Sequence, residues 1–255
     1  MFPSVFVSHG SPTIVDETGH GAAFLRSLGE SLGRPKAILC VTAHWETTVV
    51  TVGGADRPGM IYDYYGFPEH LYTLEYPAPG APALAQRAGE LIAAAGIPCT
   101  RDDERGYDHG TFMPLMLMYP DADIPVAQLS VQPALGPQHE LAVGRALTPL
   151  RGEDVLILAS GGAVHNLRWF RLGARDVPDW ASGFETWLGD KVVAGDAESI
   201  ADYRARTPHG AMAHPRDEHF LPLLVAMGAG GGGTGRVLHA GFEHGAIGMS
   251  AYAWG

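Results

Sequence analysis

Short apolar segments of strand length alternate along this chain with segments of helical period. Four apolar runs are rich in Val, Ile or Leu and are bounded by turn residues, and they predict buried strands over residues 5–8, 37–42, 125–131 and 155–159. Unbroken apolar runs of this length are typical of sheets that are covered on both faces. The alternation predicts an α/β fold, a single domain with a central, mostly parallel but mixed β-sheet flanked by helices on both faces.

The segments between these strands have the signatures of helices. Helical spacing predicts helices over residues 22–32, 81–95, 139–150, 180–193 and 220–227. Two later apolar runs, 236–239 and 247–254, predict strands, one of which can run antiparallel to the others. The glycine-rich run 228–235 follows a helix instead of opening one, so it indicates a flexible surface connection and not a phosphate-binding loop.

Size and charge exclude several classes of protein. A chain of 255 residues with 46% hydrophobic residues can bury one core, so residues 1–255 are expected to form a single catalytic domain. The 17 Lys and Arg face 28 Asp and Glu, a net charge of −11, which argues against a nucleic-acid partner. No apolar stretch approaches the ~20 residues of a membrane span, and the N-terminal run has no signal-peptide pattern. A cytoplasmic protein without a membrane partner is expected, and its oligomeric state is left open.

Histidine is the unusual residue, with 12 copies. His9 and His44 follow predicted strands directly, and His165 lies a few residues past another. Ligands of open α/β sheets bind outside the carboxyl ends of the strands, so these three histidines could share one site. One such histidine alone would more often be bonded to loop backbone. Cys40 and Cys99, by contrast, have neither the number nor the spacing of a disulfide framework or a thiolate metal site.

Other histidines add candidates without choosing among them. His109 lies in a turn-rich segment, where Asp108 is expected to orient a neighbouring imidazole. The segment TPHGAMAHPRDEHF supplies His209, His214 and His219, and spacing does not select one. Three neutral imidazoles suit Fe, Zn, Cu or Ni and leave coordination positions open for a substrate. The chain lacks the HExxH, Walker and GxSxG motifs.

Segments spread over nearly the whole chain carry a family resemblance. They are SHGSP at 8–12, AHW at 43–45, GFP at 66–68, YPAPG at 76–80, DHG at 108–110, YPDADIPVAQLS at 119–130, ASGGAVHNL at 159–167 and EHFLPLL at 218–224. In these segments, and in their order, the chain resembles the DODA-type class III extradiol dioxygenases, which include plant and bacterial 4,5-DOPA dioxygenases.

The resemblance implies a metal site. His9, His44 and His219 would be the ligands, which selects His219 where spacing could not, and Glu218 stays open as a carboxylate alternative. Fe(II) is expected for activity because it can bring a catechol and O2 together, and Zn(II) can occupy the same site.

The resemblance also implies a reaction, the opening of a catechol-type aromatic ring with O2. His109 and His165 would be the catalytic acid and base, with the division between them open. The long aromatic segment 62–80 either packs on the surface or lines the site. In the second case Tyr65 and Phe67 would bind the substrate ring together with Ser11.

Two alternative functions stay open at this point. Three imidazoles and a water also form a hydrolytic zinc site, and a branch related to this superfamily has binding or signalling roles. Dependence on O2 and Fe(II) would exclude the hydrolase, and the presence of both His109 and His165 favours chemistry over binding alone. No role is assigned to the remaining histidines named here: His20, His70, His139, His239 and His244.

Overall fold

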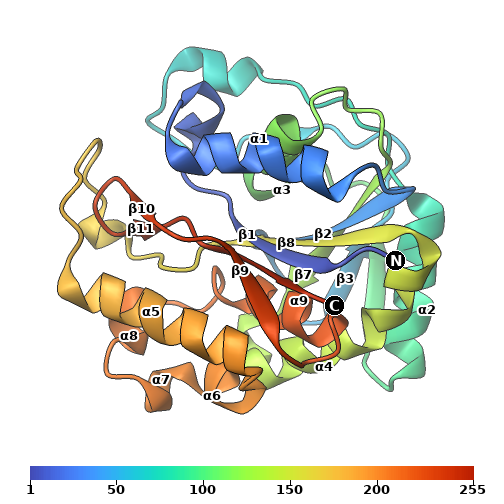
Figure 1. The fold of residues 1–255 in the computed structure, drawn as a ribbon. Coiled ribbons are helices and arrows are strands. Elements are labelled where there is room, and N and C mark those ends of the chain that lie inside the picture. The colour runs from blue at the N-terminus through green and yellow to red at the C-terminus, as the bar shows by residue number, and fades with distance from the viewer.

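An eight-stranded mixed sheet forms the centre of the computed structural model, which describes residues 1–255 (Figure 1). Its strands run in the order β5-β3-β7-β2-β8-β1-β12-β9. In chain order they are β1 (Ser4–Ser8), β2 (Ala37–Glu46), β3 (Val50–Gly53), β5 (Cys99–Asp102), β7 (Val126–Val131), β8 (Val155–Gly161), β9 (Gly235–His239) and β12 (Ala251–Trp254).

The middle of the sheet is parallel, and the antiparallel pairings lie toward its edges. β7, β2, β8 and β1 are paired in parallel, whereas β3 is antiparallel to β7 and β12 is antiparallel to β1. The predicted mixed sheet is therefore confirmed. The late run 247–254 is not one strand: β11 (Ile247–Gly248) pairs with β10 (Phe242–Glu243) in a separate hairpin, and only β12 joins the main sheet.

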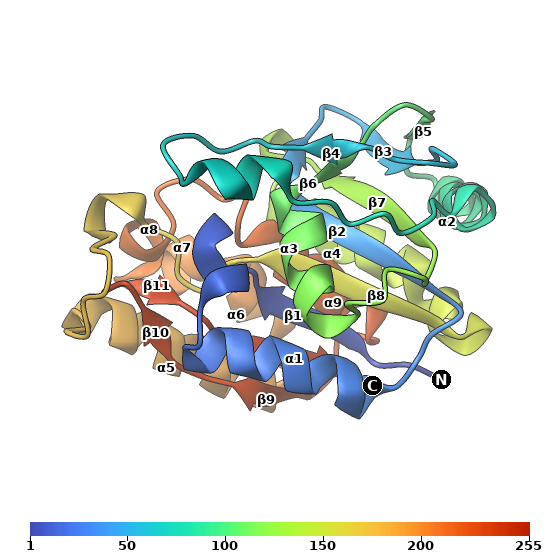
Figure 2. The same ribbon diagram turned by 90° about the horizontal axis from the view of Figure 1, so that it is seen from above.

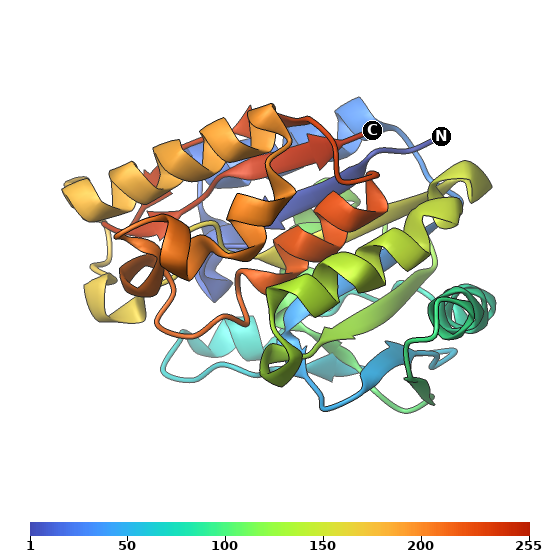
Figure 3. The same cartoon turned by 90° about the horizontal axis from the view of Figure 1, so that it is seen from below.

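Alternate strand residues face two helical layers, as the period of two in a β-strand requires. Ile38 and Cys40 of β2 pack toward α1 (His20–Leu32) and α3 (His109–Met118), in the layer that Figure 2 shows from above. Leu39 and Val41 face the opposite layer, in which α4 (Pro137–Leu147) packs against α9 (Leu221–Ala229), as Figure 3 shows.

The remaining elements lie around this framework. They are the helices α2 (Pro82–Ala94), α5 (Asp179–Ala194), α6 (Ala197–Ala201), α7 (Tyr203–Arg206) and α8 (Gly210–Ala213); the strands β4 (Met60–Ile61) and β6 (Tyr107–Asp108); and the 3-10 helices Pro12–Asp16, Glu69–Thr73, Pro133–Leu135, Thr148–Glu153 and Leu167–Trp169. None of the helices combines the length and hydrophobicity that a membrane span requires. The cytoplasmic location stays a prediction.

The predicted strands and helices of the core are confirmed, with shifted ends, but the short peripheral elements were missed, and so were two strands of the main sheet and one buried helix. β3 and β5 are short strands at one edge of the sheet. Helix α3 is buried along nearly its whole length, so its sequence is apolar on every side and has no helical period. It also contains Gly110 and Pro114, residues that normally argue against a helix. The predicted helix 139–150 ends at Leu147 and continues as a 3-10 turn.

Candidate active site

The carboxyl ends of three adjacent parallel strands bring the first two histidines together. His9 directly follows β1, and Gly10 then turns the chain with a φ of +73°, a conformation that side chains rarely tolerate. His44 lies within β2 and not after it, because the strand runs on to Glu46. The pairing of β2 with β7 shifts register between Val41 and Glu46, and this irregularity accommodates the longer strand.

The third imidazole, that of His219, comes from the C-terminal part of the chain and lies at the same place. His219 lies just before α9, and its carbonyl accepts a hydrogen bond of 2.9 Å from the backbone N–H of Gly162, directly after β8. At Gly161 a Cβ atom would lie 2.2 Å from that carbonyl oxygen. Only glycine permits this approach, so the end of β8 fixes the position of His219.

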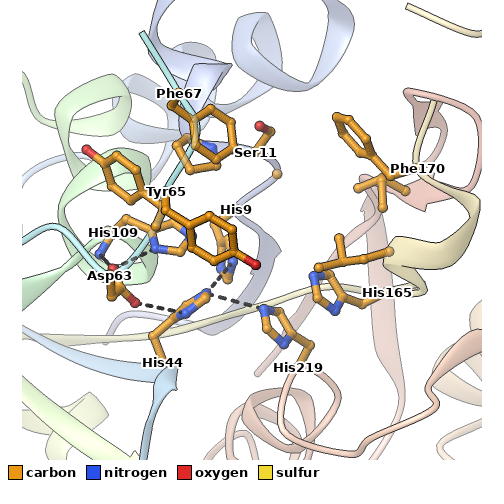
Figure 4. A pocket seen from close by; sticks show the side chains of 15 residues that line it. His9, Ser11, His44, Asp63, Tyr65, Phe67, His109, His165, Phe170 and His219 are labelled. Atoms are coloured by element: carbon orange, nitrogen blue, oxygen red, sulfur yellow. Dashed lines mark hydrogen bonds and ion pairs between the residues drawn. The ribbon is translucent and has the colours of Figure 1, made fainter. Parts of the chain in front are cut away.

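The imidazoles of His9, His44 and His219 converge through their Nε2 atoms (Figure 4). The Nε2 atom of His44 lies 3.1 Å from that of His9 and 3.2 Å from that of His219. His9 and His219 are 2% and 6% exposed. Burial is the main cause that lowers the pKa of both imidazoles well below the usual value, so these rings are neutral.

The Nδ1 atoms identify the tautomers of the rings. Ser160 donates its hydroxyl proton to the carbonyl of Gly110, so its Oγ can only accept the bond of 2.9 Å from Nδ1 of His9. Nδ1 of His44 lies 3.0 Å from Asp63. Nδ1 of His219 lies 3.3 Å from Oε1 of Glu218. Each Nδ1 therefore carries the proton.

Three Nε2 lone pairs consequently point at one another with no proton between them. This arrangement is repulsive unless a cation occupies the centre. With metal–nitrogen bonds of about 2.0–2.1 Å, tetrahedral or octahedral angles place ligand nitrogens roughly 2.9–3.4 Å apart, and the two separations of 3.1 and 3.2 Å fall in this range. The donor set fits a divalent metal whose ligands are held by hydrogen bonds from behind.

Asp63 is a site residue that the sequence interpretation missed. Its Oδ1 accepts from Nδ1 of His109 at 2.8 Å, and its Oδ2 accepts from Nδ1 of His44 at 3.0 Å. Burial alone would raise the pKa of this carboxyl, but the hydrogen bonds from His109 and His44 outweigh burial and hold the pKa below its usual range. One carboxylate thus orients two imidazoles of the site.

The expectation that Asp108 orients an imidazole is wrong. Its Oδ1 caps α3 by accepting from the N–H of Thr111, and it also accepts from the hydroxyl of Thr42. Its other oxygen pairs with Arg105 at 2.8 Å. Asp108 therefore fixes the start of the helix that begins with His109, and it acts on the site only through the backbone.

His109 and His165 lie on opposite sides of the convergent group (Figure 4). The ring of His109 lies 3.9 Å from that of His44, and the ring of His165 stacks on His219 at 3.5 Å with an angle of 6°. Burial lowers the pKa of His165 to about 3, with a further contribution from His214. Burial and the neighbouring His44 also lower the pKa of His109, against the opposing effect of Asp63.

A cavity of about 380 Å³ opens above these five histidines. The remaining lining residues are Gly10, Ser11, Pro12, Asp63, Tyr64, Tyr65, Phe67, Leu167, Phe170 and Ile247. The first part of the segment 62–80, through Asp63, Tyr64, Tyr65 and Phe67, thus lines the site, whereas Leu71 and Tyr76 of the same segment pack in the core. Ser11 borders the same space. Tyr65 is 92% exposed, so it stands at the mouth and not in the wall.

The other histidines lie outside this cavity. His214 is fully buried, and its Nε2 donates to the carbonyl of Ala163 at 2.9 Å. His20 and His239 contact each other near the surface, and His244 pairs with Glu17. His209 does not border the cavity either, so the C-terminal histidine cluster contributes only His219.

Two further wall residues, Leu167 and Phe170, gave no sequence signal of a role, because isolated apolar residues in a loop are common. Asp63 did have a signal that could have been used. It is a single aspartate within the aromatic segment YDYYGFP, where a charged residue has little reason to be partly buried unless it has partners.

Comparisons with known proteins agree over nearly the whole chain. Residues 3–255 match the family described as the catalytic LigB subunit of aromatic ring-opening dioxygenase. A 4,5-DOPA dioxygenase extradiol of Portulaca grandiflora is 44% identical over 98% of this chain and 94% of its own length. A protein of the same name from Escherichia coli K12 is 41% identical over 89% of this chain and 84% of its own length. The crystal structure of an uncharacterized Escherichia coli K12 protein matches with a TM-score of 0.84 and 34% identity, covering 100% of both chains.

Proposed function

Because the chain belongs to the LigB family of aromatic ring-opening dioxygenases, we propose that His9, His44 and His219 hold the metal at which its substrate ring is opened. The chain is an extradiol ring-cleaving dioxygenase, an enzyme that breaks the ring bond beside a pair of hydroxyl groups and adds both atoms of O2. This membership leaves the zinc hydrolase and binding-module alternatives without support. We propose that residues 1–255 form one catalytic domain.

The observation that carries the ligand assignment is the convergence of three unprotonated Nε2 atoms in a buried place. Their Nδ1 protons are committed to Ser160, Asp63 and Glu218, so the lone pairs can only face a cation or one another. Glu218 serves in this arrangement as the partner of His219, which favours the all-histidine set over a carboxylate ligand. Family enzymes depend on a metal, and we propose Fe(II), with Zn(II) able to fill the same site.

Bound Fe(II) supplies the Lewis acidity and the redox capacity that let a catechol react with O2. His109 is suited to take a proton from a catechol hydroxyl. Its Nδ1 donates to Asp63, so its Nε2 carries the lone pair, and the carboxylate stabilises the imidazolium that forms.

His165 has a different environment, since its ring makes no hydrogen bond, and the carboxylate that lies within 4.8 Å of it, Glu218, is the partner of His219. Its low pKa makes it a weak base and, once protonated, a strong acid. We therefore assign to His109 the initial base, and to His165 the uptake of the second hydroxyl proton of the substrate and its return to oxygen as the ring opens. The stacking of His165 on His219 holds it on the far side of the group from His109.

The substrate is proposed to be a catechol, since relatives are named for the catechol DOPA. Tyr65 and Phe67 are placed to contact the ring from above, and the hydroxyl of Ser11, beside Phe67 in the upper part of the cavity, is placed to contact a polar group of the substrate. Replacing Phe67 by Ala is expected to raise KM for catechols and to leave the bound metal in place. Unchanged kinetics would remove the aromatic segment from this role.

The test is anaerobic reconstitution with Fe(II), followed by a panel of catechols, with oxygen uptake and the yellow absorbance of the ring-opened semialdehyde recorded together. His165→Ala serves as the matched variant with the same ligand set. Oxygen-coupled yellow product from the wild type that is lost in the variant supports the assignment. Stoichiometric iron without oxygen uptake for any catechol would contradict it.

A further inference from the structure

The cavity separates into a polar floor and an apolar upper wall. The floor holds the five imidazoles and Asp63. The upper wall and mouth are formed mainly by Pro12, Tyr65, Phe67, Leu167, Phe170 and Ile247, with the hydroxyl of Ser11 between Phe67 and Phe170. In Figure 4, Phe67 and Phe170 stand on opposite sides of the space above the histidines. A group attached to a ring bound at the floor must therefore extend between these apolar side chains.

No lysine or arginine lines this cavity. The one ionised group of the lining is the carboxylate of Asp63, whose two oxygens accept from His109 and His44. The Fe(II) proposed at the floor would be engaged by the two catechol oxygens, so an anionic substituent at the upper wall would find no side-chain cation to pair with.

The arginines closest to the site are committed elsewhere. Arg105 pairs with Asp108, and Arg216 pairs with Glu46 and Glu218. Arg171 follows the wall residue Phe170 directly, but its Nη1 donates to the carbonyls of Arg168 and Phe170 at 3.0 and 2.7 Å. The side chain of Arg168 is exposed and does not border the cavity.

We propose that the substrate is a catechol whose ring substituent is apolar and uncharged, and that this substituent packs between Phe67 on one side and Leu167 and Phe170 on the other. The proposal rests on the assignment of the floor as the ring-opening site. It sets this chain apart from enzymes that act on DOPA, since the side chain of DOPA ends in a carboxylate and an ammonium group.

The physical reason is the cost of removing a carboxylate from water without giving it a partner. An apolar chain gains free energy by covering the exposed faces of Leu167 and Phe170. A carboxylate of the same length loses part of its hydration there and finds hydroxyl groups, of Ser11 and Tyr65, but no cation to compensate its charge. Pockets discriminate strongly when a polar group is left unpaired.

The first test compares two substrates of equal length, 4-propylcatechol and 3-(3,4-dihydroxyphenyl)propionate, with the methyl ester of the latter as an uncharged control. The iron-loaded wild type is expected to cleave the propyl compound with a kcat/KM about tenfold or more above that of the acid, and the ester is expected to lie near the propyl compound. An acid or DOPA that is cleaved as well as 4-propylcatechol overturns the proposal. Cleavage of none of them would instead overturn the ring-opening assignment itself.

The second test places a cation in the wall. Leu167 is 63% exposed and lines the cavity, so Leu167→Arg is expected to fold normally and to raise the ratio of acid to propyl kcat/KM by about tenfold. Leu172→Arg is the matched control, because Leu172 is 76% exposed, lies in the same loop and does not line the cavity. It should leave the ratio unchanged. An unchanged ratio in Leu167→Arg, with an unchanged thermal midpoint, would show that the substituent does not pass this wall.

Discussion

Two pairs of histidines in this molecule have almost the same distance between their facing ring nitrogens but differ in the protons that these nitrogens carry. In the cavity, Nε2 of His44 lies 3.1 Å from Nε2 of His9. Near the surface, Nδ1 of His20 lies 2.9 Å from Nε2 of His239. The surface contact is an ordinary hydrogen bond. His20 donates its Nε2 proton to the carbonyl of Phe242, so its Nδ1 accepts a proton from His239.

The cavity contact has no such proton. His9 and His44 have both committed their Nδ1 protons to other partners, so their Nε2 atoms meet lone pair to lone pair. A short distance between two imidazoles therefore does not by itself indicate a metal site. What indicates one is that neither of the facing nitrogens carries a proton, and this depends on the hydrogen-bond partners behind the rings.

Two histidines, His109 and His165, border the convergent group without joining it. His109→Ala and His165→Ala are each expected to lower kcat by about 10²–10⁴-fold, because each removes one proton-transfer group. Iron content should stay stoichiometric in both variants. Steady-state kinetics with iron analysis checks this. A wild-type kcat in either variant would show that the histidine it replaces has no catalytic role.

The residues behind the rings are tested next, with Asp63→Asn. An asparagine can accept a hydrogen bond from one imidazole through its oxygen but presents N–H donors to the other. Either His44 or His109 therefore loses the acceptor that keeps the proton on its Nδ1 atom. Metal affinity or activity is expected to fall about 10–100-fold. The control is Asp16→Asn, which changes a carboxylate 2.7 Å from the exposed His70. Equal effects of the two variants would show that the carboxylate behind the site has no special role.

A third kind of histidine, buried but outside the cavity, is expected to act on stability. Burial lowers the pKa of His214 from 6.5 to about 4, so the unfolded chain binds a proton more readily than the folded protein between these values. The stability from His214 is therefore present above pH 6.5 and lost as the pH falls toward 4.

His214→Gln keeps an N–H donor for the carbonyl of Ala163 and removes the titrating ring. Between pH 6.5 and 4, the free energy of unfolding of the wild type should fall more steeply than that of the variant, by up to about 1.4 kcal/mol per pH unit. Urea unfolding at several pH values measures both slopes. Parallel slopes would mean that His214 is not the proton-binding group.

The smallest effect is expected at the surface pair. His239→Ala removes the hydrogen bond to His20 and the stacking of the ring on Phe24, so the free energy of unfolding should fall by about 1 kcal/mol, with kcat and iron content unchanged. Thermal unfolding and kinetics check this. A loss of iron in this variant would break the distinction between the two histidine pairs.

The sequence predicted the parts of the molecule that depend on local pattern. The core strands, and the positions of His9 and His44 at the carboxyl edge of the sheet, followed from short apolar runs. Helix α3 did not, because a helix buried on all sides has no polar face to mark its period. The choice of His219 needed the family resemblance, since its place depends on the contact with Gly161 across the fold.

Asp63 and Leu167 belong to the part that sequence could not supply. Asp63 lies 46 residues before His109, and no local pattern relates a loop carboxylate to a ring so distant in the chain. Asp108, directly before His109, was the natural candidate from the sequence, but its hydrogen bonds go to the helix start and to Arg105. Neighbours in sequence were thus a poor guide to which group holds which imidazole.

The metal site is tested most directly by an anaerobic Fe(II) titration of the wild type and of five single Ala variants, at His9, His44, His219, His109 and His165. We expect the first three variants to lose stoichiometric iron and the last two to retain it at near wild-type affinity while losing turnover. Retention of stoichiometric, tightly bound iron by any of the first three, or its loss in either of the last two, would contradict the assignment of the convergent group as the metal site.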